Sequence, residues 1–432
     1  MPSRDHYWLP FTPNRSFAKQ PQILVRAEGL RYWNEQGDEL LDGCSGLFCS
    51  ALGHARPEIG EAMAAQYRQL DFSPPFRFAQ PAAFELAADL AQALPGDLDR
   101  IFFVNSGSEA VDTALKIALR YHHARGDGER QRFVTRDRGY HGVNFGGVSL
   151  SGMANNREFF GPGLPGVLHK RNTLVEANRF TAGEGEHGVE LADDLLGFVE
   201  AHGAESIAAC VVEPIAGSTG ILVPPRGYLS RLREICDEHG ILLIFDEVIT
   251  GFGRTGKAFA ADTFGVLPDI ITVAKALTNG AIPMGAVAVR RGIYETIAKS
   301  TPEGGIEFFH GYTYSAHPVA CAAGLATLKI FREESTFERA AELAPYFLER
   351  VFELEDIPQV VDIRGFGLLA GIDLDPTEVM GERGSKALER LFASGLVIRV
   401  TNDTLILAPA LVSDREHIDG IVDRLRATLP TL

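Results

Sequence analysis

Short apolar runs alternate with longer amphipathic segments through the middle of this chain, and no other feature limits its possible folds as strongly. Runs that are apolar throughout suit strands buried on both faces, and the longer segments suit the helices that cover them. The pattern therefore predicts an α/β fold with a large, doubly wound and mostly parallel sheet. The predicted strands are 100–104, 132–135, 208–212, 241–245, 270–273 and 285–289, and the predicted helices include 110–124 and 229–239.

The C-terminal part of the chain has a different pattern, without the regular alternation of the middle. This pattern predicts a small α+β domain. A chain of 432 residues is long enough for two or three domains. The predicted helices of the small domain are 337–354 and 386–394, and its predicted strands are 360–364, 368–372, 397–400 and 404–407.

Charge and cysteine usage narrow the class of protein. Lysine and arginine number 41 against 57 aspartate and glutamate residues, which gives a formal net charge of −16. A chain this acidic is a poor binder of nucleic acid. No apolar run approaches membrane-spanning length and no export signal is present, so we expect a cytoplasmic protein without a membrane partner. The five cysteines lack the paired spacing of a zinc site, and we expect no metal.

Two charged residues each end an apolar run, which places them at one edge of a parallel sheet. Lys275 follows 270–273, and Asp246 follows 241–245. Partial burial disfavours an ammonium and leaves a nucleophilic amine, whereas a carboxylate can keep a ring nitrogen protonated. A lysine and an acid with these tasks are the protein partners of pyridoxal phosphate (PLP). Taken alone, each residue is more often a helix cap or a solvated surface charge.

A possible phosphate site follows the first predicted strand. Ser106 and Glu109 have the spacing of a capping box at the start of a helix, and Gly107 allows a close approach to the backbone. Free N–H groups at a helix start, with the hydroxyl of Ser108 beside them, suit a phosphate. The alternative is a plain helix cap.

Other strand ends carry polar or aromatic residues with two interpretations each. Tyr140 and His141 follow 132–135, and Tyr140 could stack on a ring or pack in a surface turn. Glu213 could bond a cofactor hydroxyl or make a structural hydrogen bond. Arg399 is either paired with an internal acid such as Asp403 or kept to bind a carboxylate.

One motif suggests a dinucleotide site that the surrounding sequence excludes. The segment 251–256, GFGRTG, matches G-x-G-x-x-G. The dinucleotide fingerprint requires strand, glycines and helix in immediate succession. Here residues 247–250 separate Asp246, at the strand end, from the first glycine, and no long amphipathic helix follows, so we reject a nicotinamide cofactor.

With these motifs in view, the sequence resembles the class III aminotransferases, PLP enzymes of fold type I, over nearly its full length. Segment 243–256, LIFDEVITGFGRTG, is similar to the family's signature around the cofactor aspartate, and 272–283 is similar to its lysine segment. Segment 310–318, HGYTYSAHP, resembles the loop that reaches a partner subunit's phosphate. Three further segments are similar to the ω-amino acid:pyruvate (β-alanine:pyruvate) branch: 8–12, 41–47 and 213–225.

The resemblance implies a role for each matching residue. Lys275 would bond to the cofactor aldehyde and then carry the proton between substrate and cofactor, Asp246 would salt-bridge the pyridine nitrogen, and Tyr140 would stack on the ring. The other implied cofactor-binding residues are Ser106, Gly107, Ser108, His141, Glu213, Val248 and, from the second subunit, Thr313. The implied substrate-binding residues are Phe48, Phe76, Tyr140 and Arg399.

The resemblance also implies how the chain is divided and assembled. A large PLP-binding domain would span 55–318, and a small domain would combine the two chain ends, 1–54 and 319–432. Because Thr313 would complete the phosphate site of the second subunit, a homodimer with shared active sites would be the minimum active unit. The sequence leaves open whether dimers pair into tetramers.

The implied activity moves an amino group from a β-alanine-like ω-amino acid or a primary amine to pyruvate, in two half-reactions. The substrates are thus small amines and 2-oxo acids. Phe48 replaces the tryptophan usual in this branch and Ile406 an amide, so the pocket is more apolar and an aryl or alkyl amine is an alternative preferred donor. An intramolecular aminomutase of the same fold is a second alternative. A PLP-binding sensor without activity has no support in the sequence.

Overall fold

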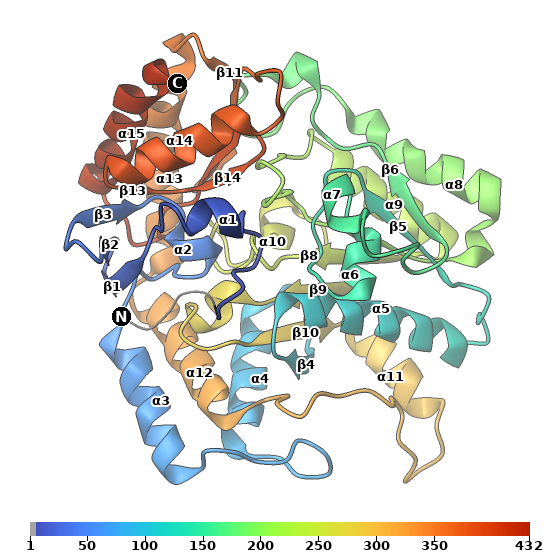
Figure 1. Ribbon diagram of the computed structural model, residues 1–432. Helices are drawn as coiled ribbons and strands as arrows, with labels where there is room; N and C mark the ends of the chain where they lie inside the picture. The colour runs from blue at the N-terminus through green and yellow to red at the C-terminus, as the bar shows by residue number, and fades with distance from the viewer. Residues whose placement is uncertain (1–5) are drawn as a thin grey trace.

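A seven-stranded sheet forms the centre of the computed structural model, which describes residues 6–432 (Figure 1). Its strand order is β4-β10-β9-β8-β7-β5-β6, and only β10 runs antiparallel to its neighbours. The sequence predicted every one of these strands except β6, which is short and ends in two polar residues. The bounds are β4 (Arg100–Val104), β5 (Arg132–Arg136), β6 (Val167–Lys170), β7 (Ile207–Val212), β8 (Leu242–Asp246), β9 (Ile270–Val273) and β10 (Gly285–Val289).

Helices cover both faces of this sheet, as strands with no exposed face require. On one face, α5 (Gly107–Ala124) and α11 (Arg291–Lys299) share a buried apolar cluster with the strands. On the other face, α4 (Pro81–Ala93) and α9 (Tyr228–His239) do the same. The predicted doubly wound, mostly parallel sheet is therefore confirmed.

The remaining helices of this part of the chain lie around the sheet. A long helix, α12 (Pro318–Glu333), packs against α4 and against α3 (Pro57–Gln69) at the bottom of Figure 1. None of the helices between residues 6 and 432 combines the length and the apolarity needed to cross a bilayer. The shorter helices are α2 (Ser45–Phe48), α6 (Phe145–Leu150), α7 (Ala154–Arg157), α8 (Asp194–His202) and α10 (Ala260–Phe264).

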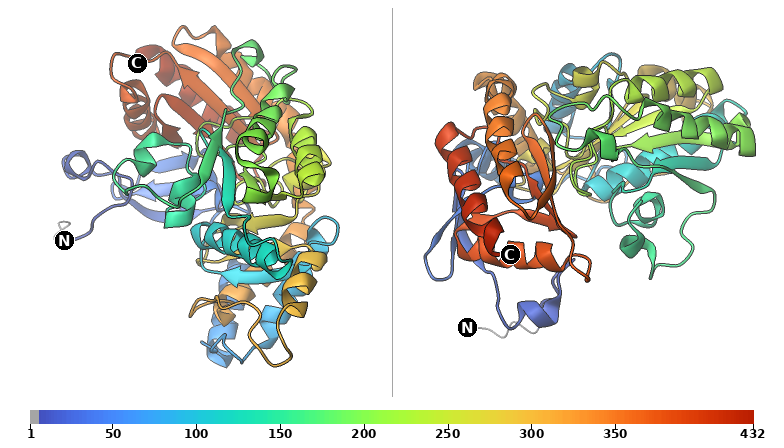
Figure 2. Two further views of the ribbon diagram at one scale, coloured as in Figure 1. Left: turned by 90° about the vertical axis from the view of Figure 1, so that its right-hand side faces the viewer. Right: turned by 90° about the horizontal axis from the view of Figure 1, so that it is seen from above.

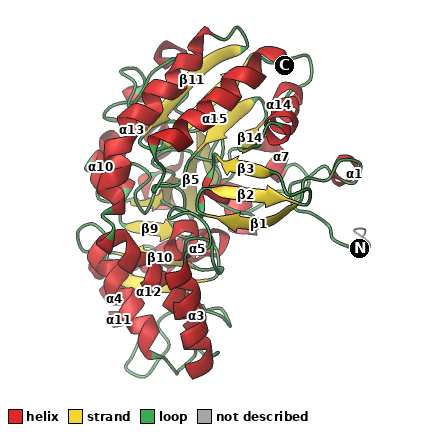
Figure 3. Ribbon diagram, turned by 90° about the vertical axis from the view of Figure 1, so that its left-hand side faces the viewer, coloured by secondary structure: helices red, strands yellow, loops and turns green. Residues whose placement is uncertain are grey.

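Two four-stranded sheets are built from the chain ends. The first has the order β1-β2-β3-β13 and the second β11-β12-β15-β14. Figure 3 shows β1, β2 and β3 beside the C-terminal strands and helices. The bounds are β1 (Leu24–Glu28), β2 (Arg31–Asn34), β3 (Glu39–Asp42), β11 (Val360–Phe366), β12 (Leu369–Leu374), β13 (Leu396–Val397), β14 (Arg399–Thr401) and β15 (Thr404–Leu407).

The structure corrects one predicted strand. The run 397–400 is divided at Ile398 between β13, which pairs in parallel with β3, and β14, which pairs with β15. Both halves are extended and partly apolar, so their local pattern is that of one strand. The division places Arg399 in a different sheet from Val397.

The C-terminal helices pack on these small sheets, at the upper left of Figure 1. They are α13 (Thr336–Phe352), α14 (Glu382–Ala393) and α15 (Arg415–Thr428). Both views of Figure 2 show this part lying beside the large sheet, and the N-terminal segment with α1 (Asn14–Phe17) extending away from the body.

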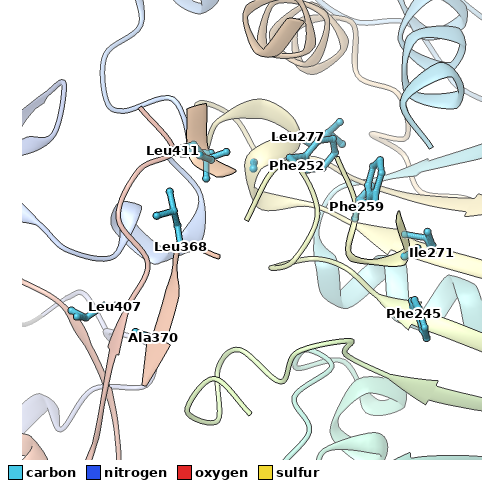
Figure 4. Packing of buried hydrophobic residues seen from close by; sticks show 14 of the residues in the cluster. Phe245, Phe252, Phe259, Ile271, Leu277, Leu368, Ala370, Leu407 and Leu411 are labelled. Carbon is cyan, nitrogen blue, oxygen red and sulfur yellow. The ribbon is translucent and has the colours of Figure 1, made fainter. Parts of the chain in front are cut away.

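One buried apolar cluster continues from the large sheet into the C-terminal part. Figure 4 shows Phe245 and Ile271 of the large sheet at one side of this cluster, and Leu368 and Leu407 at the other. Because the two parts share one core, their relative position is fixed by packing. That position matters because the candidate site draws residues from both.

Candidate active site

A cavity of about 330 Å³ opens where the strands of the large sheet end. This carboxyl edge is where open α/β sheets bind their ligands. Most of the residues singled out from the sequence line the cavity. They are Ser106, Gly107, Ser108, Tyr140, His141, Glu213, Asp246, Val248 and Lys275.

Lys275 presents a partly buried amine to the cavity. It begins the short 3₁₀ helix η4 (Lys275–Thr278) directly after β9, with a φ of 49°. A β-carbon makes this left-handed conformation unfavourable, so the surrounding structure holds it. Burial lowers the pKa of Lys275, and the neighbouring Cys49 and Asp246 raise it by less. The ring centroid of Phe48 lies 5.9 Å from Nζ.

Asp246 ends β8, and hydrogen bonds hold its carboxylate in place. Oδ1 accepts from the Thr272 hydroxyl (3.1 Å) and from the Val248 N–H (3.2 Å), and Oδ2 lies 2.8 Å from His141 Nδ1. The side chain is 5% exposed. Because Asp246 is directly opposite Thr272 of β9, the carboxylate and the Lys275 amine enter the cavity from neighbouring strands.

The N-terminus of α5 forms a third side of the cavity. The Ser106 hydroxyl accepts the Glu109 N–H (3.2 Å), and the Glu109 carboxylate accepts the N–H of Asn105 (2.7 Å). The predicted capping interaction is therefore present, with Glu109 reaching one residue further back than in the standard box. A β-carbon on Gly107 would lie 3.0 Å from a Val248 methyl group. Gly107 and Ser108 at this helix start line the cavity, and the N–H groups of a helix start suit an anion.

Tyr140 is held by the buried Glu213. The carboxylate accepts the Tyr140 N–H and the Gly217 N–H, each at 2.9 Å. Burial raises the pKa of Glu213, and the Asp246 charge adds to the rise. Of the two interpretations of Glu213, these contacts are structural hydrogen bonds, which hold the Tyr140 backbone at the cavity wall. A bond to a cofactor hydroxyl stays a prediction.

Arg399 lies on β14 close to this wall, without a carboxylate partner among residues 6–432. Asp403, the predicted internal partner, instead accepts the N–H groups of Gly381 and Gly384 (2.8 and 2.9 Å). The buried Nε of Arg399 also lacks a partner in this described part of the chain. The Arg399 charge opposes the rise that burial causes in the pKa of Tyr140, which reflects their proximity. Of the two interpretations, the geometry favours a guanidinium kept for a substrate carboxylate.

The other predicted residues lie outside the cavity of the single chain. Phe48 is 2% exposed and packs in a buried cluster with Ile249 and Ile406, so the two departures from the family pattern are neighbours. Phe76 is 57% exposed and lines a second cavity of about 300 Å³ together with the loop that precedes α12. Thr313 is exposed on that same loop.

Several cavity residues were not singled out from the sequence. The half-buried side chain of Cys49 lines the cavity that Lys275 also lines. Thr272 does not line the cavity but bonds to Asp246, and strand register could have indicated it because it lies opposite that residue. The resemblance in 272–283 is the only signal that could have indicated Ile282. Nothing in the sequence indicated that the apolar Ile249 and Met284 line the cavity.

Comparison with known proteins identifies the family. The model of the aminotransferase class-III family matches residues 14–429. An omega-aminotransferase of Caulobacter vibrioides is 52% identical, over 98% of this chain and 97% of its own length. An omega-amino acid–pyruvate aminotransferase of Pseudomonas putida is 45% identical, over 99% and 96%. The omega transaminase of Pseudomonas jessenii in complex with PMP has a TM-score of 0.94 and 34% identity, over 99% and 96%.

The fold and this site thus define a PLP-dependent transferase of fold type I. The chain belongs to the class-III aminotransferases, and it is an enzyme of amino-group transfer.

The cavity residues fit the cofactor of this family. A partly buried amine, a carboxylate and a helix N-terminus converge on one space, and they match the aldehyde, the ring nitrogen and the phosphate of PLP. His141 Nε2 is buried without a partner among the described residues, which leaves a polar atom available at this site.

Proposed function

We propose that this enzyme transfers an amino group from an ω-amino acid or a primary amine to pyruvate. PLP is held in the cavity by the cofactor-binding residues that the family resemblance implies. One observation carries the proposal: Lys275, Asp246 and the N-terminus of α5 face the same cavity from the carboxyl ends of β9, β8 and β4. Relatives named for ω-amino acids and pyruvate support this acceptor.

When bound, PLP supplies an aldehyde that bonds to amines and a ring that withdraws electrons from the carbon beside that nitrogen. Lys275 supplies the amine for this bond, and its lowered pKa favours the neutral, nucleophilic form. The same Nζ then moves the proton to and from the substrate carbon. Asp246, fixed by Thr272 and His141, keeps a negative charge where the ring nitrogen would be protonated.

The remaining residues of the site orient the cofactor and the substrate and enclose them. Backbone N–H groups at Gly107 and Ser108 bind the phosphate, and the helix dipole of α5 favours its charge. Tyr140, held by Glu213, stacks on one face of the ring, and Val248 packs on the other. Arg399 binds the carboxylate of pyruvate or of an ω-amino acid by its fork.

The active unit that we propose is a homodimer in which Thr313 and Phe76 serve the other subunit's cavity. Both residues lie away from the cavity of their own chain. Around them the surface exposes large apolar side chains, which typically mark an interface. Phe78 and Phe84 are each 68% exposed, and Phe309 is 86% exposed. The domain boundaries 55–318, and 1–54 with 319–432, and a cytoplasmic location also remain proposals.

The donor that we favour is a β-alanine-like ω-amino acid, with apolar primary amines accepted as well. Ile249, which lines the cavity and packs in one buried cluster with Phe48 and Ile406, gives the cavity an apolar surface, and this supports apolar amines as donors. No feature of the site favours an intramolecular aminomutase over transfer to pyruvate.

An absorbance titration tests this function. Purified protein reconstituted with PLP should show the visible band of cofactor bonded to Lys275. β-Alanine should bleach the band without any oxo acid present, and pyruvate should restore it. Lys275→Ala, in which the bond cannot form, is the matched control. A band that β-alanine and 1-phenylethylamine both leave unchanged would contradict amino transfer, and bleaching that pyruvate cannot reverse would contradict the acceptor.

A further inference from the structure

On the basis of the proposed function, we propose that Thr401 is a positioning residue that fixes the Arg399 guanidinium relative to Tyr140 and thereby sets the affinity for carboxylate-bearing substrates. Thr401 does not line the cavity. It acts through a series of hydrogen bonds that joins the C-terminal sheet to the cavity wall.

Arg399 lies on a strand that has a sheet partner on one side only. β14 is the edge of its sheet and pairs with β15 alone, with Arg399 opposite Ile406 and Thr401 opposite Thr404. Three residues of pairing give such a strand few ladder hydrogen bonds. The position of β14 therefore also depends on contacts with residues outside this sheet.

One such contact comes from a loop of the large domain, on the face of β14 that carries the Thr401 side chain. The Thr401 hydroxyl donates to the backbone carbonyl of Ser218 at 2.8 Å, and Ser218 is 5% exposed. Because alternate residues of a strand face the same way, Thr401 and Arg399 lie on one face of β14. A bridge between Ala216 and Leu222 closes the loop behind Ser218.

The same loop also holds the cavity wall, through the residue that precedes Ser218. The Gly217 N–H donates to one oxygen of the Glu213 carboxylate, and the Tyr140 N–H donates to the other oxygen. Three hydrogen bonds thus lead from β14 to Tyr140, through Ser218 and Glu213. This path sets the separation between the guanidinium and the aromatic ring.

The loop keeps its place without Thr401. Arg364 Nε donates to the Gly220 carbonyl at 2.8 Å, and its two terminal nitrogens each bond to Asp373 at 2.8 Å. A β-carbon on Gly371 would lie 2.4 Å from that same carbonyl, so the backbones already touch. Loss of the Thr401 hydroxyl should therefore free β14 rather than the loop.

A displacement of β14 changes the binding only of substrates that contact Arg399. A guanidinium binds a carboxylate through two parallel hydrogen bonds, and this geometry is sensitive to small displacements. A neutral amine makes no such bonds. The consequence is a selective loss of affinity for carboxylates.

The test compares Thr401→Val, which keeps the shape and removes the hydroxyl, with Thr401→Ser, which keeps the hydroxyl. KM and kcat are measured with β-alanine and with 1-phenylethylamine at saturating pyruvate, because the acceptor also carries a carboxylate that Arg399 binds. Calorimetry gives the Kd of 3-hydroxypropanoate, an unreactive carboxylate of the same length as β-alanine. Thr401→Val should raise the KM of β-alanine and the Kd of 3-hydroxypropanoate about 3- to 10-fold, the effect of one lost hydrogen bond. Arg399→Ala should show the same selectivity with a larger effect.

Values for 1-phenylethylamine should stay within about twofold of wild type, and Thr401→Ser should behave like wild type. Equal losses with both amines, unchanged carboxylate binding, or a Thr401→Ser variant as impaired as Thr401→Val would overturn the inference. If the wild-type enzyme reacts with neither amine, the proposed function fails, and the 3-hydroxypropanoate titration still decides the role of Thr401.

Discussion

Two lysines show how burial determines what an amine can do. Lys275 is partly buried beside an open cavity, so its neutral form can meet a substrate. Lys170, on β6, is 1% exposed, and its amine donates to the Tyr228 hydroxyl and lies 4.5 Å from that ring's centroid. Arg136 is directly opposite on β5 and equally buried. Burial lowers the pKa of Lys170 to about 8, and no ion pair to either cation occurs within residues 6–432.

Lys170→Met should change how stability depends on pH. Below pH 8 the lysine is charged in both the folded and the unfolded chain, so the folded chain bears the full cost of burying the charge. Between pH 8 and the ordinary lysine value of 10.5, the folded chain loses the proton first and the cost disappears. Wild type should therefore gain about 3 kcal/mol relative to Lys170→Met across this window.

The measurement is the unfolding free energy of both proteins at neutral pH and near pH 10. Only the difference between them is interpreted, because other groups titrate in the same range. Lys299→Met, at an amine that is 78% exposed, is the control and should show no such change. A difference between wild type and Lys170→Met that is independent of pH would contradict the burial argument.

At the scale of single elements, the start of α5 does two tasks with one short sequence. Ser106 and Glu109 satisfy backbone groups of the helix, and Gly107 leaves space beside Val248. The capping interaction could be predicted because both partners are within four residues of each other. The contact with Val248 could not, because it depends on the position of β8.

Gly107→Ala and Gly60→Ala should therefore have opposite effects. A methyl group at Gly107 meets Val248 at 3.0 Å, whereas at Gly60, inside α3, it meets nothing within 4 Å. Gly60→Ala should stabilise the protein by about 0.5–1 kcal/mol, the usual gain in a helix interior, and leave cofactor affinity unchanged. Gly107→Ala should lower PLP affinity roughly tenfold, because overpacking moves the cavity wall. Fluorescence titration with PLP and thermal unfolding measure both effects, and unaltered PLP binding by Gly107→Ala would show that the wall adapts.

At the scale of the whole molecule, segments from the two ends of the chain pair with each other. β3 and β13 pair although they are far apart in sequence, and the Arg399 side of the site depends on this assembly. Thr313 and Phe76 are exposed in the single chain, and the proposed dimer would bury them.

Mixed dimers test this sharing. Lys275→Ala removes the reactive amine of one chain, and Thr313→Ala removes the phosphate contact that the chain gives to its partner. A dimer of one chain of each kind contains one site with both residues intact. At low PLP, where Thr313→Ala should lose cofactor roughly 10-fold more readily, mixing after subunit exchange should restore up to about half of wild-type activity, one site of two. Unmixed variants are the controls, and an absence of recovery in verified hybrids would show that each chain uses its own Thr313.

Much of the fold and of the cavity followed from local sequence. Lys275, Asp246, Tyr140 and Glu213 were predicted because each lies at the end of a strand or within four residues after it, and parallel strands bring such residues to one edge. Apolar patterns and capping pairs depend on neighbouring residues, which is why the sequence alone determined the large sheet and the start of α5.

Only the tertiary structure decided how distant segments meet. The run 397–400 has the pattern of a single strand, yet pairing with β3 on one side of Ile398 and with β15 on the other divides it. That division determines the position of Arg399 on β14. The packing of the N-terminal segment places Cys49 beside Lys275. Strand pairing and close packing between segments hundreds of residues apart depend on the shape of the whole core, which no short stretch of sequence contains.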